Sequence, residues 1–200
     1  MSRTAVRIGP EDQGRHMTLE EFNTADAQPG HLYELGRGVI TVVHVPDRKH
    51  LVQVHAARAQ FYAYSLAHPG RIDNIAAGGE CKILLSGAES ERHPDLAIYK
   101  APPTDDEDVW ATWIPEIVIE VVSPGSEHRD YVEKREEYLQ FGVLEYWVID
   151  AGRQEMLALR RSGGRWAERI VRSGEIYQTP QLPDFEFALA PIFDAARAAS

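Results

Sequence analysis

Apolar residues recur at helical spacing in two long stretches of the chain. In the first stretch, residues 47–70, the side chains of Leu51, Val54, Phe61 and Tyr64 follow this spacing before a Pro-Gly pair interrupts it. The pattern therefore predicts a long helix that ends at this pair.

The second stretch covers residues 126–141 and is followed by Gly142, a residue type that commonly ends helices. At about 100° per residue, Lys134 and Arg135 fall on the apolar side of the predicted helix, and the acidic residues are assigned to the solvent side. The apolar side comprises Tyr131, Val132, Tyr138, Leu139 and Phe141, and the solvent side comprises Asp130, Glu133, Glu136, Glu137 and Gln140.

Runs of β-branched and aromatic residues between turn residues predict the strands. A hairpin around Gly-Arg-Gly occupies residues 31–45, and an antiparallel meander with a Ser-Gly-Gly turn occupies 155–180. Before the hairpin, Thr18 and Glu21 have the spacing of a capping box and predict a short helix. Single strands are predicted at 71–77, 80–86, 93–100, 114–123 and 144–150.

The order of these elements predicts an α/β (α+β) fold, with a central mixed sheet flanked by the two long helices and followed by the C-terminal antiparallel meander. Residues 1–16 are polar and are expected to form a flexible N-terminal segment, with 17–200 as a single domain. The tail at 182–196 is partly apolar, which indicates that it docks on this domain.

Composition and charge narrow the functional classes. The chain is 44% hydrophobic and 26% charged, which is typical of a globular protein. It has no apolar run long enough for a transmembrane helix and no apolar signal-peptide core, so we expect a cytoplasmic protein without membrane contact. The single cysteine, Cys81, excludes an internal disulfide and a multi-cysteine zinc site. The net charge of −10 argues against a broad basic surface for nucleic acid, although a metal ion held by carboxylates still attracts phosphate.

A carboxylate lies within a strongly apolar predicted strand. Glu120 shares a strand face with Val118 and Val122, where an uncompensated charge is costly. If the strands at 93–100 and 114–123 are neighbours, Asp95 converges with Glu120 near one end of the sheet. Lys134 either reaches these carboxylates or extends to the rim of the core.

Two carboxylates and a lysine suit metal-assisted hydrolysis of a phosphodiester. Asp95 and Glu120 offer oxygen ligands to a hard divalent cation, Mg²⁺ or Mn²⁺, which polarises the phosphate and lowers the pKa of a bound water. Lys134 then orients or deprotonates this water and stabilises charge on the phosphate. The plainer interpretations are an Asp95 that bonds the backbone at a strand start and a buried ion pair of Glu120 with Lys134.

Several stretches carry a resemblance to a known family: "YELGRGVI", "HPDLAIYK", "PEIVIEVVSP" and "KREEYLQFGVLEYWVID". Their order and spacing over residues 18–150 resemble the PD-(D/E)XK nuclease superfamily and, within it, the "putative restriction endonuclease" (Uma-type) family. The combination of EVVSP, K-x₃-Y and G-V-x-E-Y-W is the most specific part. The resemblance implies a restriction-endonuclease-like fold, usually homodimeric, with a divalent cation and nucleic acid, DNA above all, as the substrate.

The chain departs from the superfamily pattern at Val122, where the D/E-x-K motif has lysine. The resemblance implies that this lysine has moved to the following helix, as Lys134. Glu34 matches an acidic position of the family and is either a further member of the site or an ordinary edge-strand glutamate. His50 also matches a family position, with helix capping or packing as the plainer explanation. Ser123 lacks a partner histidine and is interpreted as a turn or cap residue.

The sequence thus predicts a metal-dependent endonuclease of DNA with Asp95, Glu120, Lys134 and Glu34 as catalytic residues. An alternative from another class is a non-catalytic binding or regulatory module that retains the fold. A third possibility is a phosphohydrolase of small nucleotides that uses the same chemistry. The acidic run at 105–108 is interpreted as a solvated loop, with a second metal site as the alternative.

Overall fold

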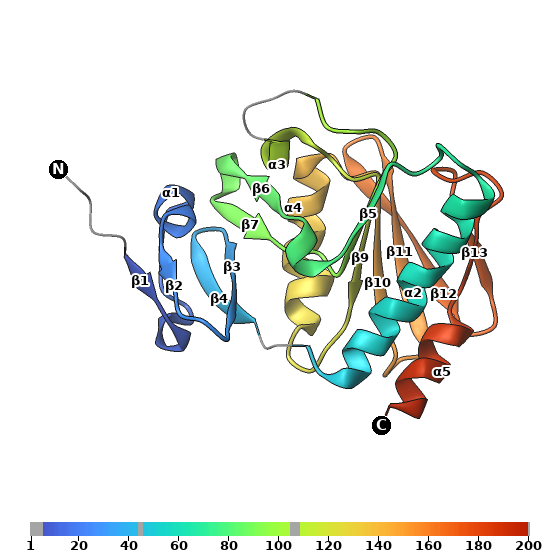
Figure 1. The fold of residues 1–200 in the computed structure, drawn as a ribbon, viewed down its shortest axis with the longest axis horizontal. Coiled ribbons are helices and arrows are strands. Elements are labelled where there is room, and N and C mark those ends of the chain that lie inside the picture. The colour runs from blue at the N-terminus through green and yellow to red at the C-terminus, as the bar shows by residue number, and fades with distance from the viewer. Residues whose placement is uncertain (1–5, 44–45, 105–108, 200) are drawn as a thin grey trace.

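A six-stranded mixed sheet forms the centre of the computed structural model, which describes residues 6–43, 46–104 and 109–199 (Figure 1). The acidic run at 105–108 therefore lies outside the described residues. The two central strands of the sheet are parallel, and the other neighbours are antiparallel. The order across the sheet is β12 (Arg165–Arg172), β11 (Glu155–Ser162), β10 (Glu145–Asp150), β9 (Ile117–Val121), β8 (Leu96–Tyr99) and β5 (Asn74–Ala76).

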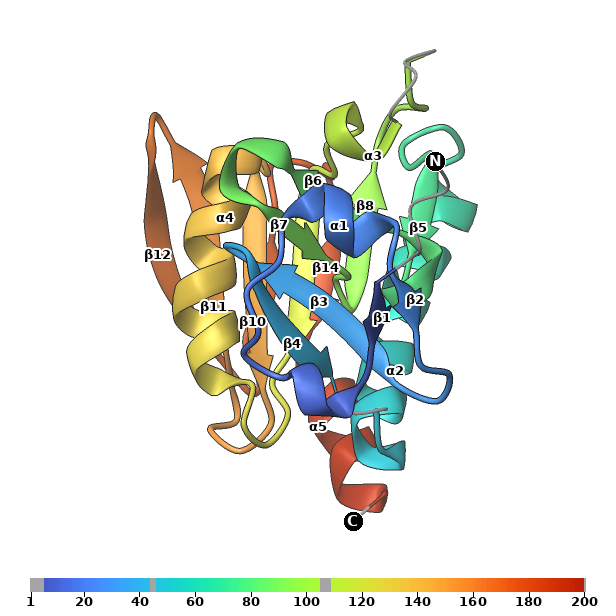
Figure 2. The ribbon, with the colours of Figure 1, turned by 90° about the vertical axis from the view of Figure 1, so that its left-hand side faces the viewer.

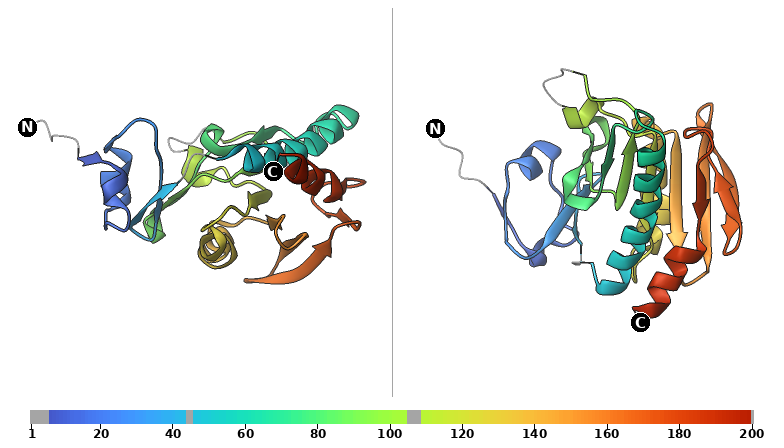
Figure 3. Two further views of the ribbon diagram at one scale, coloured as in Figure 1. Left: turned by 90° about the horizontal axis from the view of Figure 1, so that it is seen from below. Right: turned by 45° about the vertical axis from the view of Figure 1, so that its right-hand side comes forward.

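Helices cover both faces of this sheet (Figure 3). On one face, α2 (Arg48–Ala67) and α5 (Ala190–Ala198) pack over the odd-numbered residues of β9. On the other face, α4 (Lys134–Phe141) packs over Val118. Because side chains alternate along a strand, Glu120 faces α4 with Val118.

A smaller antiparallel sheet lies beside the central one, and Figure 2 looks onto it. Its strand order is β4 (Val39–Val43), β3 (Leu32–Gly36), β7 (Ser90–Arg92) and β6 (Ile83–Leu85). Leu35 and Ile40 are fully buried in a core of its own. The remaining elements are α1 (Leu19–Asn23), α3 (Val109–Thr112), β1 (Arg7–Ile8), β2 (Asp26–Ala27), β13 (Ile176–Gln178) and β14 (Glu186–Ala188).

The structure confirms the predicted fold class, with both long helices, the hairpin of β3 and β4 and the Ser-Gly-Gly hairpin of β11 and β12. The prediction of one meander over 155–180 is wrong at its end, because β13 pairs with β14 in a separate two-stranded sheet. The capping box also forms, because the Thr18 hydroxyl accepts from the Glu21 N–H and the Glu21 carboxylate accepts from the Thr18 N–H. The tail docks as expected, through α5, whose Ile192 and Phe193 are fully buried. β7 was not predicted, since three residues carry too little pattern to be read as a strand.

Residues 6–16 are hydrogen-bonded to the rest of the molecule. β1 pairs with β2, the Gly14 N–H donates to the carbonyl of Ile40, and the Ile40 N–H donates to the carbonyl of Arg15. Residues 1–5 lie outside the described residues. The division into a flexible segment at 1–16 and one domain at 17–200 stays a prediction.

The predicted solvent face of the second helix is wrong at two positions. Asp130 and Glu137 are both buried, and Val132, assigned to the apolar side, is 46% exposed. Asp130 precedes Lys134 by four residues and Glu137 follows it by three, so both share the face of Lys134 on a helix. Sorting the residues by polarity alone separated side chains that the helical spacing brings together.

Candidate active site

A cavity of about 500 Å³ opens where the two sheets and the second helix meet. Its walls come from β3 and β4, the start of α2, the segment before β8, the end of β9, the turn at 123–126 and the helix that follows. Among the residues that the structure describes, five acidic and two basic side chains line it. The cavity therefore holds an excess of negative charge when its histidines are neutral.

The register of β8 and β9 brings Asp95 next to Glu120. Leu96 pairs with Ile119 in antiparallel register, and Asp95 and Glu120 are the adjoining residues. The Val121 N–H donates to Asp95 Oδ2 at 2.7 Å, which fixes the Asp95 carboxylate at the end of β9. The expectation that these two strands are neighbours is confirmed, and both carboxylates line the cavity.

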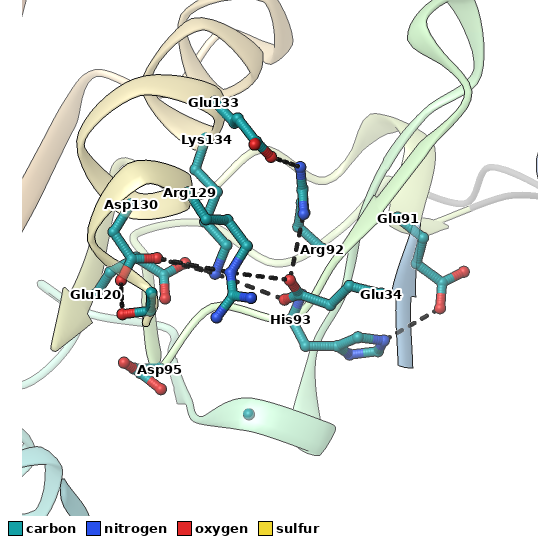
Figure 4. A network of polar contacts seen from close by, with 12 residues as sticks. Glu34, Glu91, Arg92, His93, Asp95, Glu120, Arg129, Asp130, Glu133 and Lys134 are labelled. Atoms are coloured by element: carbon teal, nitrogen blue, oxygen red, sulfur yellow. Dashed lines mark hydrogen bonds and ion pairs between the residues drawn. The ribbon is translucent and has the colours of Figure 1, made fainter. Parts of the chain in front are cut away.

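Lys134 enters the same cluster from the helix. Its ammonium lies 2.9 Å from Glu120 Oε1, 3.5 Å from Glu34 Oε1 and 3.6 Å from Asp130 Oδ1 (Figure 4). These carboxylates raise the pKa of Lys134 above its ordinary value, although burial acts in the opposite direction. Lys134 therefore remains a cation at neutral pH and is no proton acceptor. Of the three roles considered for it, orienting the water and stabilising charge on the phosphate are left.

Glu120 is buried beside carboxylates and an ammonium, which shift its pKa in opposite directions. Burial, followed by the repulsion of Asp95 and Asp130, raises the pKa of Glu120 to about 8 despite the attraction of Lys134. The Tyr138 hydroxyl donates to Glu120 Oε1 at 2.6 Å, which keeps the carboxyl group oriented. The single ammonium of Lys134 therefore does not fully compensate the negative charge of Glu120 and the neighbouring carboxylates.

The negative charge of Glu34, by contrast, is well compensated by neighbouring cations. It contacts Arg92 at 3.3 Å and Lys134 at 3.5 Å, and it accepts a hydrogen bond from the His93 N–H at 3.1 Å. Although burial raises the pKa of Glu34, the charges of Lys134 and Arg92 lower it to about 2. Glu34 belongs to the buried cluster, and the interpretation as an ordinary edge-strand residue does not describe its contacts.

Arg92 connects Glu34 to the second helix. Its guanidinium is fully buried and donates to both carboxylate oxygens of Glu137, at 2.7 and 3.0 Å. It lies directly against Gly36 at the end of β3, where a Cβ atom would come within 2.8 Å of the guanidinium carbon. Any side chain at position 36 would therefore force the Arg92 guanidinium to shift.

His50 does not cap α2, whereas Ser123 has the plainer role expected of it. The cap is Asp47, whose carboxylate accepts from the His50 N–H. The His50 side chain instead touches the cluster, with Nε2 at 3.0 Å from Asp95 Oδ1. The Ser123 N–H donates to the Ser126 hydroxyl, as expected of a turn residue.

Four residues of the cluster were missed or misassigned at the level of sequence: Arg92, Arg129, Asp130 and Glu137. The spacing relative to Lys134 was the available signal for Asp130 and Glu137, since residues three and four apart share a helix face. Arg92 gave no signal, because it lies on a strand too short to be recognised.

The donor set fits a hard cation. Asp95 and Glu120 supply carboxylate oxygens at the cavity wall, and the raised pKa of Glu120 indicates that further positive charge is favourable there. In the described part of the chain, no group of three or more His, Cys, Asp and Glu side chains is arranged to hold a metal ion. A cation at this wall would therefore have two protein carboxylates and solvent, which is the coordination that Mg²⁺ commonly has in proteins.

Comparisons with known proteins address the chain as a whole. A family model described as "Putative restriction endonuclease" (Uma2) matches residues 19–190. A solved structure described as a putative nuclease of DUF820, from Anabaena variabilis, is similar with a TM-score of 0.72 and 16% sequence identity. The similarity covers 90% of this chain and 99% of that one, and at this identity it shows the fold alone. The search of curated proteins gave no match. None of the helices in the described ranges is long and apolar enough to span a membrane.

Proposed function

The chain belongs to the Uma2 family of restriction-endonuclease-like proteins, and we propose that it hydrolyses phosphodiester bonds of DNA with a divalent cation, Mg²⁺ or Mn²⁺. The observation that carries the proposal is the contact of Lys134 with Glu120 beside Asp95, within one cavity. Homodimeric assembly and a cytoplasmic location stay predictions.

Asp95 and Glu120 are the proposed ligands of the cation, which would activate a water molecule and polarise the phosphate when bound. Val121 holds the Asp95 carboxylate through its N–H, and Tyr138 holds that of Glu120 through its hydroxyl. Both carboxylates are thus pre-oriented by groups that take no part in the reaction. Such preorganisation lowers the reorganisation cost of the transition state.

Lys134 acts as a permanent cation in this proposal. Because its pKa is raised, it cannot accept a proton from water near neutral pH. Its ammonium instead favours the charged form of Glu120 against the effect of burial, and it stabilises negative charge that develops on the phosphate. Glu34 orients Lys134 from the side of the small sheet, at 3.5 Å.

Nicking of supercoiled DNA in Mg²⁺ or Mn²⁺ tests the proposal. We expect Glu120→Gln to lower the rate roughly a thousandfold, because it removes a cation ligand without changing the side-chain shape. Glu116→Gln, one residue before the same strand and outside the cavity, is the matched control and should retain the rate of the wild type. Equal rates for the wild type and Glu120→Gln would contradict the proposal.

A non-catalytic binding module remains the second candidate. It is favoured by Val122 at the position of the superfamily lysine and by the three contacts of Lys134, which suit a structural ion pair. In that case neither divalent cation supports nicking, and Glu120 contributes to stability alone.

A further inference from the structure

We propose that Arg129 binds a non-bridging oxygen of the substrate phosphate in the cavity. This inference rests on the proposed function, since it concerns the same site. It assigns recognition of the anion to one side chain and separates it from the charge compensation performed by Lys134.

Arg129 has hydrogen-bonding capacity that the protein leaves unused. The residue lies in a π-helical turn, Arg129–Glu133, directly before α4, and its side chain lines the cavity with 19% of its surface exposed. Its Nε is buried and has no hydrogen-bond partner within the described ranges. The nearest carboxylates, Glu34 at 3.8 Å and Asp130 at 4.0 Å, are too distant for hydrogen bonds.

Both of these carboxylates are already occupied by other donors. Glu34 is held by Arg92 and by the His93 N–H, and the Ser126 hydroxyl donates to Asp130 Oδ2 at 2.5 Å. In Figure 4 the guanidinium of Arg129 lies beside Lys134 and is turned away from Arg92. Because the Nε atom is itself covered by protein, a phosphate in the cavity would accept from the terminal nitrogens of the guanidinium, at the end of a side chain that is 19% exposed.

Lys134, the other cation that lines the cavity, is less available to a phosphate because it already contacts carboxylates of the protein. Lys134 contacts three carboxylates within 3.6 Å. Arg129, in the described part of the chain, has only the two long carboxylate contacts. A phosphodiester that enters a cavity with five acidic side chains needs a cation that is not already neutralised. The planar guanidinium fork matches two phosphate oxygens, which an ammonium does not.

The helix geometry supports this assignment. π-helical turns are rare and often occur at functional sites, where they change the direction of a side chain. Here the turn covers Arg129 to Glu133 and directly precedes Lys134, so one segment presents both cations to one cavity.

The test measures binding of DNA without cleavage. In the Glu120→Gln background, a short fluorescein-labelled duplex is titrated by anisotropy at several salt concentrations in Mg²⁺. Adding Arg129→Met should weaken binding about tenfold and reduce the slope of log K against log salt by about one, as expected for one lost phosphate contact. Arg135→Met, on the same helix and paired with Glu168 outside the cavity, is the control and should change neither quantity.

A second variant distinguishes loss of the phosphate contact from loss of folding. Arg129→Lys retains the charge and should keep the salt slope while weakening binding several-fold, because the fork is lost. An unchanged affinity for Arg129→Lys, or an unchanged slope for a folded Arg129→Met, would overturn the inference. A purely structural role for Arg129 shifts the thermal midpoint and leaves the salt slope unchanged.

The two proposals fail in different ways. If the wild type binds duplex with a slope that depends on Arg129 but never cleaves it, the nuclease proposal is wrong and the phosphate contact stands. If the wild type cleaves DNA and Arg129→Met cleaves it with the same kcat and KM, the inference is wrong and the nuclease proposal stands. If the wild type neither binds nor cleaves, both are wrong.

Discussion

The buried ionic network has two parts that differ in how well their charges are matched. In the hairpin-side cluster, Glu34, Arg92 and Glu137, a fully buried guanidinium meets two carboxylates and the pKa of Glu34 is lowered to about 2. In the sheet-side cluster, Asp95, Glu120 and Asp130, the carboxylates outnumber the single ammonium of Lys134.

The pKa values of the carboxyl groups differ between the two clusters in the same sense. Burial and carboxylate crowding raise the pKa of Glu120 to about 8 and raise that of Asp130 above its ordinary value. Removing one partner of a well-compensated buried ion pair is strongly destabilising, whereas a carboxyl group with a raised pKa at a cavity wall is a candidate for a binding or catalytic site. The contrast supports the proposed division, in which the first cluster stabilises the fold and the second takes part in the proposed chemistry.

Removing the centre of the hairpin-side cluster should have the largest effect on stability. We expect Arg92→Met to lower the free energy of unfolding by about 3–5 kcal/mol, because Glu34 and Glu137 are left buried without their partner. Urea unfolding followed by circular dichroism measures the change, with the exposed Arg165→Met as the control. A loss no larger than that of the control would show that the hairpin-side cluster does not stabilise the fold.

The sheet-side cluster should respond to pH in the opposite sense to an ordinary salt bridge. The pKa of Glu120 is raised on folding from 4.5 to about 8, so its contribution to stability is fully present below pH 4.5 and is lost as the pH rises through 8. Without divalent cations, we expect the stability of the wild type relative to Glu120→Gln to fall by on the order of 4 kcal/mol across this range.

Thermal melts of the wild type and Glu120→Gln near pH 5 and pH 8, each with and without Mg²⁺, measure this change. Mg²⁺ should stabilise the wild type at the higher pH and have less effect on the variant, since the cation replaces the missing positive charge. A Glu120→Gln protein that is less stable by about 3–5 kcal/mol at both pH values, with no response to Mg²⁺, would favour the structural ion pair.

The smallest effect concerns the group that orients Glu120. Tyr138→Phe removes the hydroxyl that donates to Glu120 Oε1 and keeps the buried ring. We expect a loss of about 1 kcal/mol in the free energy of unfolding and a weaker response to Mg²⁺. The exposed Tyr62→Phe is the control, and indistinguishable urea midpoints for the two variants would show that the hydrogen bond contributes nothing.

The pairing of Glu120 with Lys134 could be predicted from the sequence, whereas the hairpin-side cluster could not, for a physical reason. Strand alternation put Glu120 on an inward face, and helix spacing put Lys134 on the side that meets it. The hairpin-side cluster was not predictable, because it joins Arg92 and Glu137 across 45 residues and through a strand of three residues. Local periodicity carries no information on such a pairing.

Gly36 shows that the buried ionic network also restricts a position that carries no charge. The residue has no functional group, yet any side chain there would push against a guanidinium that Glu137 holds in place and that cannot move into solvent. The turn of a surface hairpin is therefore as restricted in sequence as the charged residues of the cavity. In a library of single substitutions, position 36 would group with the ion cluster, although its own chemistry gives no reason to do so.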